Sequence, residues 1–319
     1  MARLTPPLVR RLLVPAMGAA VVAATVAAVG AGPFLRGIAS LTPVPILGAV
    51  LLAAAATAAA AWRWSVVAGA LGIPLTWPAA VAAYYRSQFL NTVLPGGVLG
   101  DVHRAYRHGR GAAQPVAAAR AVATERIAGQ LAQLVLVVAV LTVLGASAVL
   151  PGTLALAAVI VLAAAAALGI VAATPRGRRL ARRELADLRR VAASPGRVLA
   201  VVASSAIVVA CHAAAFVIAC LATGVAASPR ELIVLALVAL SAGSVPVNLG
   251  GWGPREAASA SAFALVGLGS GAGLAASAAF GVLTMIALAP GAIVLVADRI
   301  AASRAPTRRP VPVPQEIPA

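Results

Sequence analysis

Charged and amide side chains gather at three places in a chain that is otherwise strongly apolar. Only 10% of the 319 residues are charged, and 62% are hydrophobic. Too few polar groups remain to cover a soluble surface, so the long apolar runs predict a membrane protein. A charged group at membrane depth is costly unless it faces a cavity or another charge. These three places are therefore the candidates for function.

The first place combines a polar helix face with a glycine-rich break. Tyr84, Gln88 and Asn91 follow i, i+4, i+7 spacing and share one face of a short predicted helix. A proline and three glycines then break the helix: Pro95, Gly96, Gly97 and Gly100. Broken backbone at depth is tolerated only inside protein or beside a water-filled cavity. The candidate binding side chains here are Arg86, Asn91, Asp101 and Arg104. The alternative is an interfacial loop with an ordinary helix stop signal.

The second place is Glu125-Arg126, near the start of a long apolar run. Arg126, Gln130 and Gln133 again follow i, i+4, i+7 spacing, which makes a polar stripe on an apolar helix. Two interpretations are open. Glu125 and Arg126 either fix helix packing as a structural pair, or they form the wall of a cavity that meets a charged group.

The third place runs from Asn248 to Glu256 and opens a short helix. Its backbone break contains Gly250, Gly251 and Gly253. Glu256 is predicted in the first turn, where the helix dipole favours an acid, and Arg255 is left to bind an anion or to pair with a carboxylate. The alternative is a tight cytoplasmic turn. The first and third places are similar and lie in different halves of the chain, a pattern that is typical of transporter sites.

The elements that must position these residues are membrane-spanning helices. Apolar runs long enough to cross a bilayer lie near 12–31, 45–62, 117–149, 153–173, 198–222, 231–247 and 273–297. Shorter segments near 79–94 and 256–268 adjoin the glycine-rich breaks. The sequence predicts an all-α, polytopic integral membrane protein with about eight transmembrane helices plus a re-entrant or broken-helix segment. The segment 256–268 either crosses or is re-entrant.

The distribution of arginine predicts the orientation of the chain. The 25 basic residues outnumber the 8 acidic ones, and most of them flank the apolar runs. If the arginine-containing segments beside the apolar runs are placed on the cytoplasmic side, both termini lie in the cytoplasm, and only Arg36 and Arg230 lie on the opposite side. Residues 1–304 then form one transmembrane domain with a basic cytoplasmic connector at 175–197, and the proline-rich tail 305–319 is predicted to be disordered. The basic charge suits anionic lipid, and no nucleic-acid partner is expected.

The polar motifs resemble the transmembrane region of lysylphosphatidylglycerol synthases. The likeness rests on Arg86, Phe89, Asn91, Leu94-Pro95-Gly96, Gly100-Asp101 and Arg104, on Glu125-Arg126, and on Gly251-Trp252-Gly253-Pro254-Arg255-Glu256. It covers about residues 10–300. The resemblance implies a flippase-like member that stands alone, without the aminoacyltransferase domain of the two-part members. One departure is Val-Asn-Leu-Gly-Gly-Trp, where many relatives begin with Pro-Gly-Gly, and it bears on the substrate.

The expected function is movement of a polar lipid headgroup, of a phospho- or aminoacyl-lipid, across the cytoplasmic membrane. Arg86, Arg126 and Arg255 are the expected anion contacts, because the planar guanidinium makes paired hydrogen bonds to phosphate. Asp101, Glu125 and Glu256 would balance them or meet a cationic headgroup. No enzyme activity, cofactor or metal is expected, since His103 and His108 give little support for a metal site. The alternative is a non-transporting partner of a lipid-modifying enzyme or glycosyltransferase, which would dock on the 176–197 helix.

Overall fold

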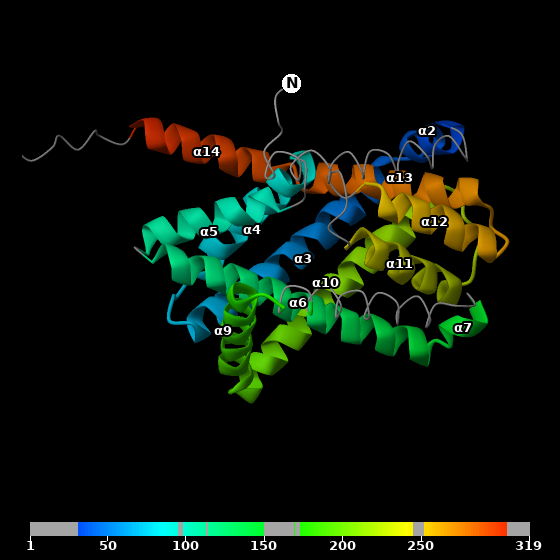
Figure 1. The fold of residues 1–319 in the computed structure, drawn as a ribbon. Coiled ribbons are helices and arrows are strands. Elements are labelled where there is room, and N and C mark those ends of the chain that lie inside the picture. Colours follow the sequence, from blue (N-terminus) through cyan, green and yellow to red (C-terminus); the bar gives the residue numbers. More distant parts are fainter. Residues whose placement is uncertain are drawn as a thin grey trace, which may run out of the picture.

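The computed structural model describes residues 31–94, 98–112, 114–149, 169, 173–244 and 252–304, and their regular elements are helices (Figure 1). The first half contains α2 (Ala31–Ala39), α3 (Pro43–Ala70), α4 (Trp77–Val93), α5 (Leu99–Gly111), α6 (Pro115–Val143) and α7 (Ala146–Val149). The second half contains α9 (Pro175–Ala192), α10 (Pro195–Ala222), α11 (Pro229–Gly243), α12 (Pro254–Leu265), α13 (Ser270–Ala287) and α14 (Pro290–Arg304). The prediction of an all-α, polytopic membrane protein is confirmed.

Four described stretches are long and apolar enough to cross a membrane. They are α3, α6, α10 and the stretch Ser270–Asp298, which contains α13 and most of α14. Proline occupies the first turn of α3, α6 and α10, where its missing N–H costs nothing. The predicted span near 12–31 lies outside the described residues apart from residue 31, as does the span near 153–173 apart from residues 169 and 173, and so does the tail 305–319.

Three predicted boundaries differ from the structure. The segment that follows the first glycine-rich break was not among the predicted helices, but it is helix α5. Its composition is too polar to be recognised as a packed helix, yet α5 packs against both α4 and α6. The run 117–149 is divided, because α6 ends at Val143 and Gly145 has a positive φ of 58°. The last run is divided ahead of Pro290, which cannot continue the hydrogen bonding of α13.

Two stretches of the chain repeat the same order of elements. Unit 1 comprises α3, α4, α5 and α6, and unit 2 comprises α10, α11, α12 and Ser270–Asp298. The first helix of each unit has 28 residues, and the last stretch of each has 29. The two intervening short helices have 17 and 13 residues in unit 1, and 15 and 12 in unit 2.

The turn after the first helix of each unit has the same hydrogen bonds. Gly72 and Gly224 have φ of 79° and 78°, a left-handed conformation that glycine adopts without a Cβ penalty. The next residue then donates back to the helix, from Ile73 N to Ala68 O at 2.9 Å and from Val225 N to Cys220 O at 3.0 Å. This match identifies an internal repeat that lengths alone would leave uncertain.

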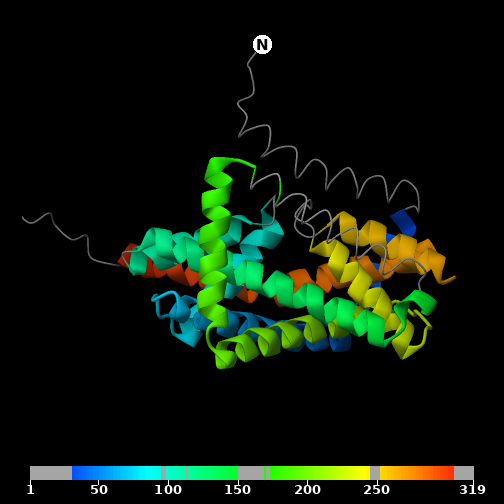
Figure 2. The ribbon, with the colours of Figure 1, turned by 60° about the horizontal axis from the view of Figure 1, so that its bottom comes forward.

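The two units run in opposite directions. Figures 1 and 2 show α3 antiparallel to α10, and α6 antiparallel to α13. The α4–α5 hairpin lies at one end of the bundle, and the α11–α12 hairpin lies at the other. An inverted repeat with interrupted helices is an architecture that places a transporter's binding site between the two halves.

Helix α9 runs across α6 and is held there by polar contacts (Figure 2). The buried Asp187 accepts hydrogen bonds from Arg120 of α6, from Nε at 2.9 Å and from Nη2 at 2.6 Å. Thr124 of α6 donates to Glu184 at 3.1 Å, and burial raises the pKa of this carboxyl above its usual value. The connector is therefore a docked helix whose other face carries exposed arginines.

Asp187→Asn is expected to speed trypsin cleavage within α9 about tenfold. Hydrogen bonds to a charged group stabilise by roughly 1.5–3 kcal/mol, and partial solvent exposure of Arg120 reduces this figure. The experiment compares cleavage rates at the α9 arginines in purified protein. Asp298→Asn, the same chemical change on α14, is the control and should leave the rate unchanged. Equal rates for wild type and Asp187→Asn would show that this ion pair does not hold α9.

Candidate functional site

Glu125 lies at the centre of a buried polar network. Its Oε1 accepts hydrogen bonds from Arg63 Nε at 2.9 Å and from the Tyr84 hydroxyl at 2.7 Å. Its Oε2 accepts from Arg104 Nη2 at 3.1 Å. The four residues belong to α6, α3, α4 and α5, and Arg63 Nη1 also donates to Ser205 of α10 at 2.9 Å. One fully buried carboxylate thus connects all of unit 1 and reaches the first helix of unit 2.

Aromatic rings surround the buried cation of Arg104. Its guanidinium carbon lies 4.4 Å from the centroid of the Trp64 ring and 4.1 Å from that of Tyr84. Arg104 is 1% exposed. Facing aromatic rings attract a desolvated guanidinium through their quadrupoles, so the two rings offset part of the cost of burying the charge.

Asp101 connects the two helices of the first hairpin. It accepts a hydrogen bond from Ser87 Oγ of α4 at 3.1 Å, and it pairs with Arg104 at 3.1 Å and with Arg126. The Asn91 side chain donates to Asp101 and accepts from the Gly100 N–H at 2.7 Å. We call the Glu125 network the set Arg63, Tyr84, Ser87, Asn91, Asp101, Arg104, Glu125 and Arg126. Its three arginines face two carboxylates, which leaves one positive charge.

A second polar cluster surrounds Glu256 at the start of α12. Glu256 Oε2 accepts from the Gly253 N–H at 2.7 Å, and Oε1 accepts from Arg255 Nη2 at 2.6 Å. Ser277 of α13 contacts both Arg255 Nε and Glu256 Oε1 at 3.0 Å. The Arg255 guanidinium lies 5.4 Å from the Trp252 ring and 5.0 Å from the Phe280 ring. Of the two roles predicted for Arg255, the structure shows the pair with a carboxylate.

A cavity of about 220 Å³ opens next to Arg255, and we call it the Arg255 cavity. A single water needs roughly 10–15 Å³ of such space, so this cavity has room for a hydrated polar group. Helices α6, α10, α11, α12 and α13 all contribute to its wall. Its polar side chains are Gln133, His212, Ser244, Arg255 and Thr284.

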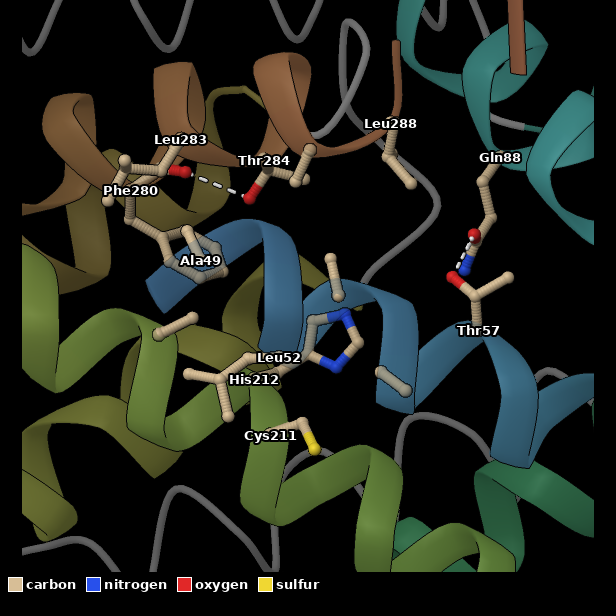
Figure 3. A pocket seen from close by; sticks show the side chains of 14 residues that line it. Ala49, Leu52, Thr57, Gln88, Cys211, His212, Phe280, Leu283, Thr284 and Leu288 are labelled. Carbon is tan, nitrogen blue, oxygen red and sulfur yellow. Dashed lines mark hydrogen bonds between the residues drawn. The ribbon is translucent and has the colours of Figure 1, made fainter. Parts of the chain in front are cut away.

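A smaller cavity of about 40 Å³ adjoins the first one, and we call it the narrow cavity. The two cavities share His212, Phe280 and Thr284. Figure 3 shows His212 and Cys211 on α10, and Thr57 of α3 hydrogen-bonded to Gln88 of α4 at 2.9 Å. The Nδ1 of His212 lies 2.8 Å from the Val208 carbonyl oxygen. A carbonyl requires a donor, so the neutral ring carries its proton on Nδ1 and leaves Nε2 as an acceptor.

The structure brings most of the predicted side chains into two groups. Asn91, Asp101, Arg104, Glu125 and Arg126 belong to the Glu125 network, and Arg255 and Glu256 form the second cluster. Glu125 and Arg126 do not pair with each other. Arg86 belongs to neither group, because it pairs with Asp298 of α14. The predicted backbone positions Pro95, Gly96, Gly97, Gly250 and Gly251 lie outside the described residues, whereas Gly100 and Gly253 make the contacts given above.

Sequence reasoning missed several residues that the structure places at these sites. Arg63 and Asp298 were not among the predicted site residues. Trp64, Ser205 and Ser277 had no signal, because single aromatic and hydroxyl residues are common in apolar helices. A charged residue inside or at the edge of a span was the available signal for Arg63 and Asp298.

Comparison with known proteins identifies a family. A family model described as the lysylphosphatidylglycerol synthase TM region matches residues 11–291. No curated protein matches the chain. In the part of the chain that the structure describes, no group of three or more His, Cys, Asp or Glu side chains is placed to hold a metal ion.

Proposed function

Since this chain belongs to the family of the lysylphosphatidylglycerol synthase transmembrane region, we propose that it moves a polar lipid headgroup between the leaflets of the cytoplasmic membrane. The observation that carries this proposal is the Arg255 cavity, a polar space of about 220 Å³ among spanning helices. The lipid is a phospholipid, and its acyl chains stay in the bilayer while its headgroup passes through the protein.

The chemistry of the cavity wall suits a phosphate that carries a hydroxyl or amine substituent. Arg255 supplies a cation for the phosphate, and its planar fork is already oriented by Glu256 and Ser277. His212 Nε2 is an acceptor for a headgroup hydroxyl or ammonium, and Gln133 and Thr284 supply further hydrogen bonds. Moving an isolated ion into hydrocarbon costs several kcal/mol or more, and a polar cavity lowers this barrier.

The Glu125 network has a different role in this proposal. Its residues line neither of the two cavities, and its carboxylate is fully buried. Five helices meet at Glu125 and Ser205, so the network anchors α4 and α5 of the first hairpin to α3, α6 and α10. The movement down a concentration difference needs no energy source.

Filling the Arg255 cavity is expected to slow headgroup movement at least tenfold. Leu240 of α11 lines this cavity, and Leu240→Trp would occupy space that the headgroup needs. Liposomes with headgroup-labelled phospholipids are treated with dithionite, and the rate at which inner-leaflet label becomes exposed is measured. Ile233→Trp is the matched control, because Ile233 is an exposed residue of the same helix. It should change the rate less than twofold.

A double variant tests the charge of the site without leaving a buried ion unpaired. Arg255→Gln combined with Glu256→Gln removes both partners, so a folded protein with slow transport is expected. Equal rates for wild type, Leu240→Trp and the double variant would exclude this cavity as the path. If wild-type liposomes match empty liposomes for every headgroup, transport is excluded, and the docking of a lipid-modifying enzyme on α9 becomes the function to test.

A further inference from the structure

Two arginines of the first hairpin converge on one carboxylate of the last helix. Arg86 of α4 pairs with Asp298 of α14, and Arg107 of α5 donates to the same oxygen of Asp298 at 2.7 Å. The Arg86 side chain is 8% exposed, and its buried Nε has no hydrogen-bond partner in the described structure. Two cations therefore face one anion, and a buried N–H still lacks an acceptor.

The internal repeat shows that this contact has an open counterpart. Here α14 packs tightly on α4, since a Cβ atom at Gly291 would lie 2.3 Å from the Tyr85 carbonyl oxygen. In unit 2 the equivalent elements are the later part of α6 and α11. There the two elements make far fewer contacts, and the Arg255 cavity lies between Gln133 and Val137 on one side and Leu240 on the other. The same helix contact is therefore tight in unit 1 and loose in unit 2.

Part of the wall of the narrow cavity is the repeat equivalent of part of the wall of the Arg255 cavity. Counted from the first residue of each corresponding helix, Leu240 of α11 has the position of Gln88 in α4, and Gln133 of α6 has the position of Leu288 in the stretch Ser270–Asp298. Gln88 and Leu288 both line the narrow cavity (Figure 3). The wall of the narrow cavity at Gln88 and Leu288 therefore corresponds to the wall of the Arg255 cavity at Leu240 and Gln133, and the two cavities measure about 40 and 220 Å³.

We propose that Arg86 and Arg107 form a second phosphate-binding site, which the Asp298 carboxylate occupies in this structure. This inference rests on the proposed function. A lipid phosphate replaces Asp298 on the two guanidinium groups, and α14 then separates from α4. The narrow cavity expands at the first hairpin as the Arg255 cavity contracts at the second. A phosphate oxygen is chemically suited to both sites, because arginine binds carboxylate and phosphate with the same geometry.

Asp298 is suited to be displaced rather than to serve as a permanent anchor. Its side chain is 27% exposed, whereas that of Glu125 is completely buried. An exchange of one oxyanion for another at a partly hydrated site keeps the arginines paired throughout. No equivalent exchange is open to Glu125, because four donor groups surround its carboxylate within the bundle.

The native Cys211 reports the opening, because it lines the narrow cavity. Cys220→Ala removes the second, buried thiol and provides the reference protein. In nanodiscs of neutral phosphatidylcholine, Asp298→Asn is expected to raise the rate at which a water-soluble thiosulfonate modifies Cys211 at least tenfold. Asp187→Asn, a change of the same type on α9, should leave this rate within twofold of the reference.

The second arm tests the ligand. Short-chain phosphatidic acid should raise the Cys211 rate of the reference protein at least threefold, and it should have no effect on Arg86→Gln/Arg107→Gln/Asp298→Asn. Inorganic phosphate at the same concentration distinguishes the two sources: a smaller response supports a lipid ligand, and an equal response overturns the lipid assignment. Size-exclusion chromatography checks that each variant is folded.

Two results would overturn the proposal. An unchanged Cys211 rate in Asp298→Asn would show that the ion pair does not close the narrow cavity. A faster Cys211 modification rate in Asp298→Asn without a response to phosphatidic acid would show that Asp298 only holds α14 against α4 and does not occupy a phosphate site. The dithionite transport assay distinguishes these outcomes from a failure of the proposed function. Headgroup movement without a change in the Cys211 modification rate would reject only the second phosphate-binding site.

Discussion

Glu125→Gln is expected to lower the apparent unfolding temperature of the purified protein by roughly 10 °C. The amide keeps the shape of the side chain but removes the charge that Arg63 and Arg104 share. Removing one partner of a buried ion pair costs about 3–5 kcal/mol, because the remaining charge stays buried. Arg104 retains its ion pair with Asp101, whereas no second carboxylate pairs with Arg63 among the described residues. The larger loss is therefore expected at the contact between α3 and α6.

The measurement is the temperature at which half of the monodisperse protein is lost at a fixed heating rate, since membrane proteins often unfold irreversibly. Glu184→Gln is the matched control. Glu184 lies on the docked helix α9, and its hydrogen bond is to the neutral Thr124. Its apparent unfolding temperature should stay within about 2 °C of wild type. A shift as small as this for Glu125→Gln would show that the network contributes little to stability.

Gly100→Ala is expected to disrupt the α4–α5 hairpin. A Cβ atom at this position would lie 1.9 Å from the Ser87 carbonyl oxygen and 2.8 Å from Asn91 Oδ1. The nearest atom belongs to the backbone of α4, so no side-chain rotation relieves the overlap. Overpacking a buried position costs about 1–3 kcal/mol and occasionally more. This substitution is expected to exceed that range, because the two helices must separate and Asp101 loses Ser87.

Gly111→Ala provides the control for Gly100→Ala on the same helix. A Cβ atom at Gly111 would meet no other atom within 4 Å. Alanine favours a helix by about 1 kcal/mol over glycine, so this variant is expected to be as stable as wild type or slightly more so. Both variants are compared by their yield of monodisperse protein and by their apparent unfolding temperature. Equal results for the two would mean that α4 and α5 do not approach each other closely at Gly100.

The repeat changes the interpretation of the two glycine motifs. Each motif connects two short helices into a hairpin, and the hairpins lie at opposite ends of the bundle (Figure 1). The acidic residues of the motifs, Asp101 and Glu256, have comparable places near the start of α5 and of α12. Their partners differ, since Asp101 meets Arg126 of the following helix α6 and Glu256 meets its neighbour Arg255. The two ends of the protein therefore differ electrostatically although the repeat relates them.

The sequence by itself determined the class of the protein and the location of its polar positions. Apolar runs, first-turn prolines and glycine breaks act through neighbouring residues, so their effects are readable locally. The spans at α3, α6 and α10 and the short helices α4 and α12 follow from these signals. Helix α5 did not follow, because its helical structure depends on packing between α4 and α6.

Only the tertiary structure decided which charges meet. Arg63 and Glu125 are 62 residues apart, and Arg86 and Asp298 are 212 residues apart. Spacing within one helix shows which residues share a face, but it contains no information on the helix that packs against that face. Arg86 was grouped with Asp101 and Arg104 from the sequence, yet the packing of α14 on α4 pairs it with Asp298. The inverted repeat was hidden for the same physical reason, because direction and contact between the units arise only when the helices pack.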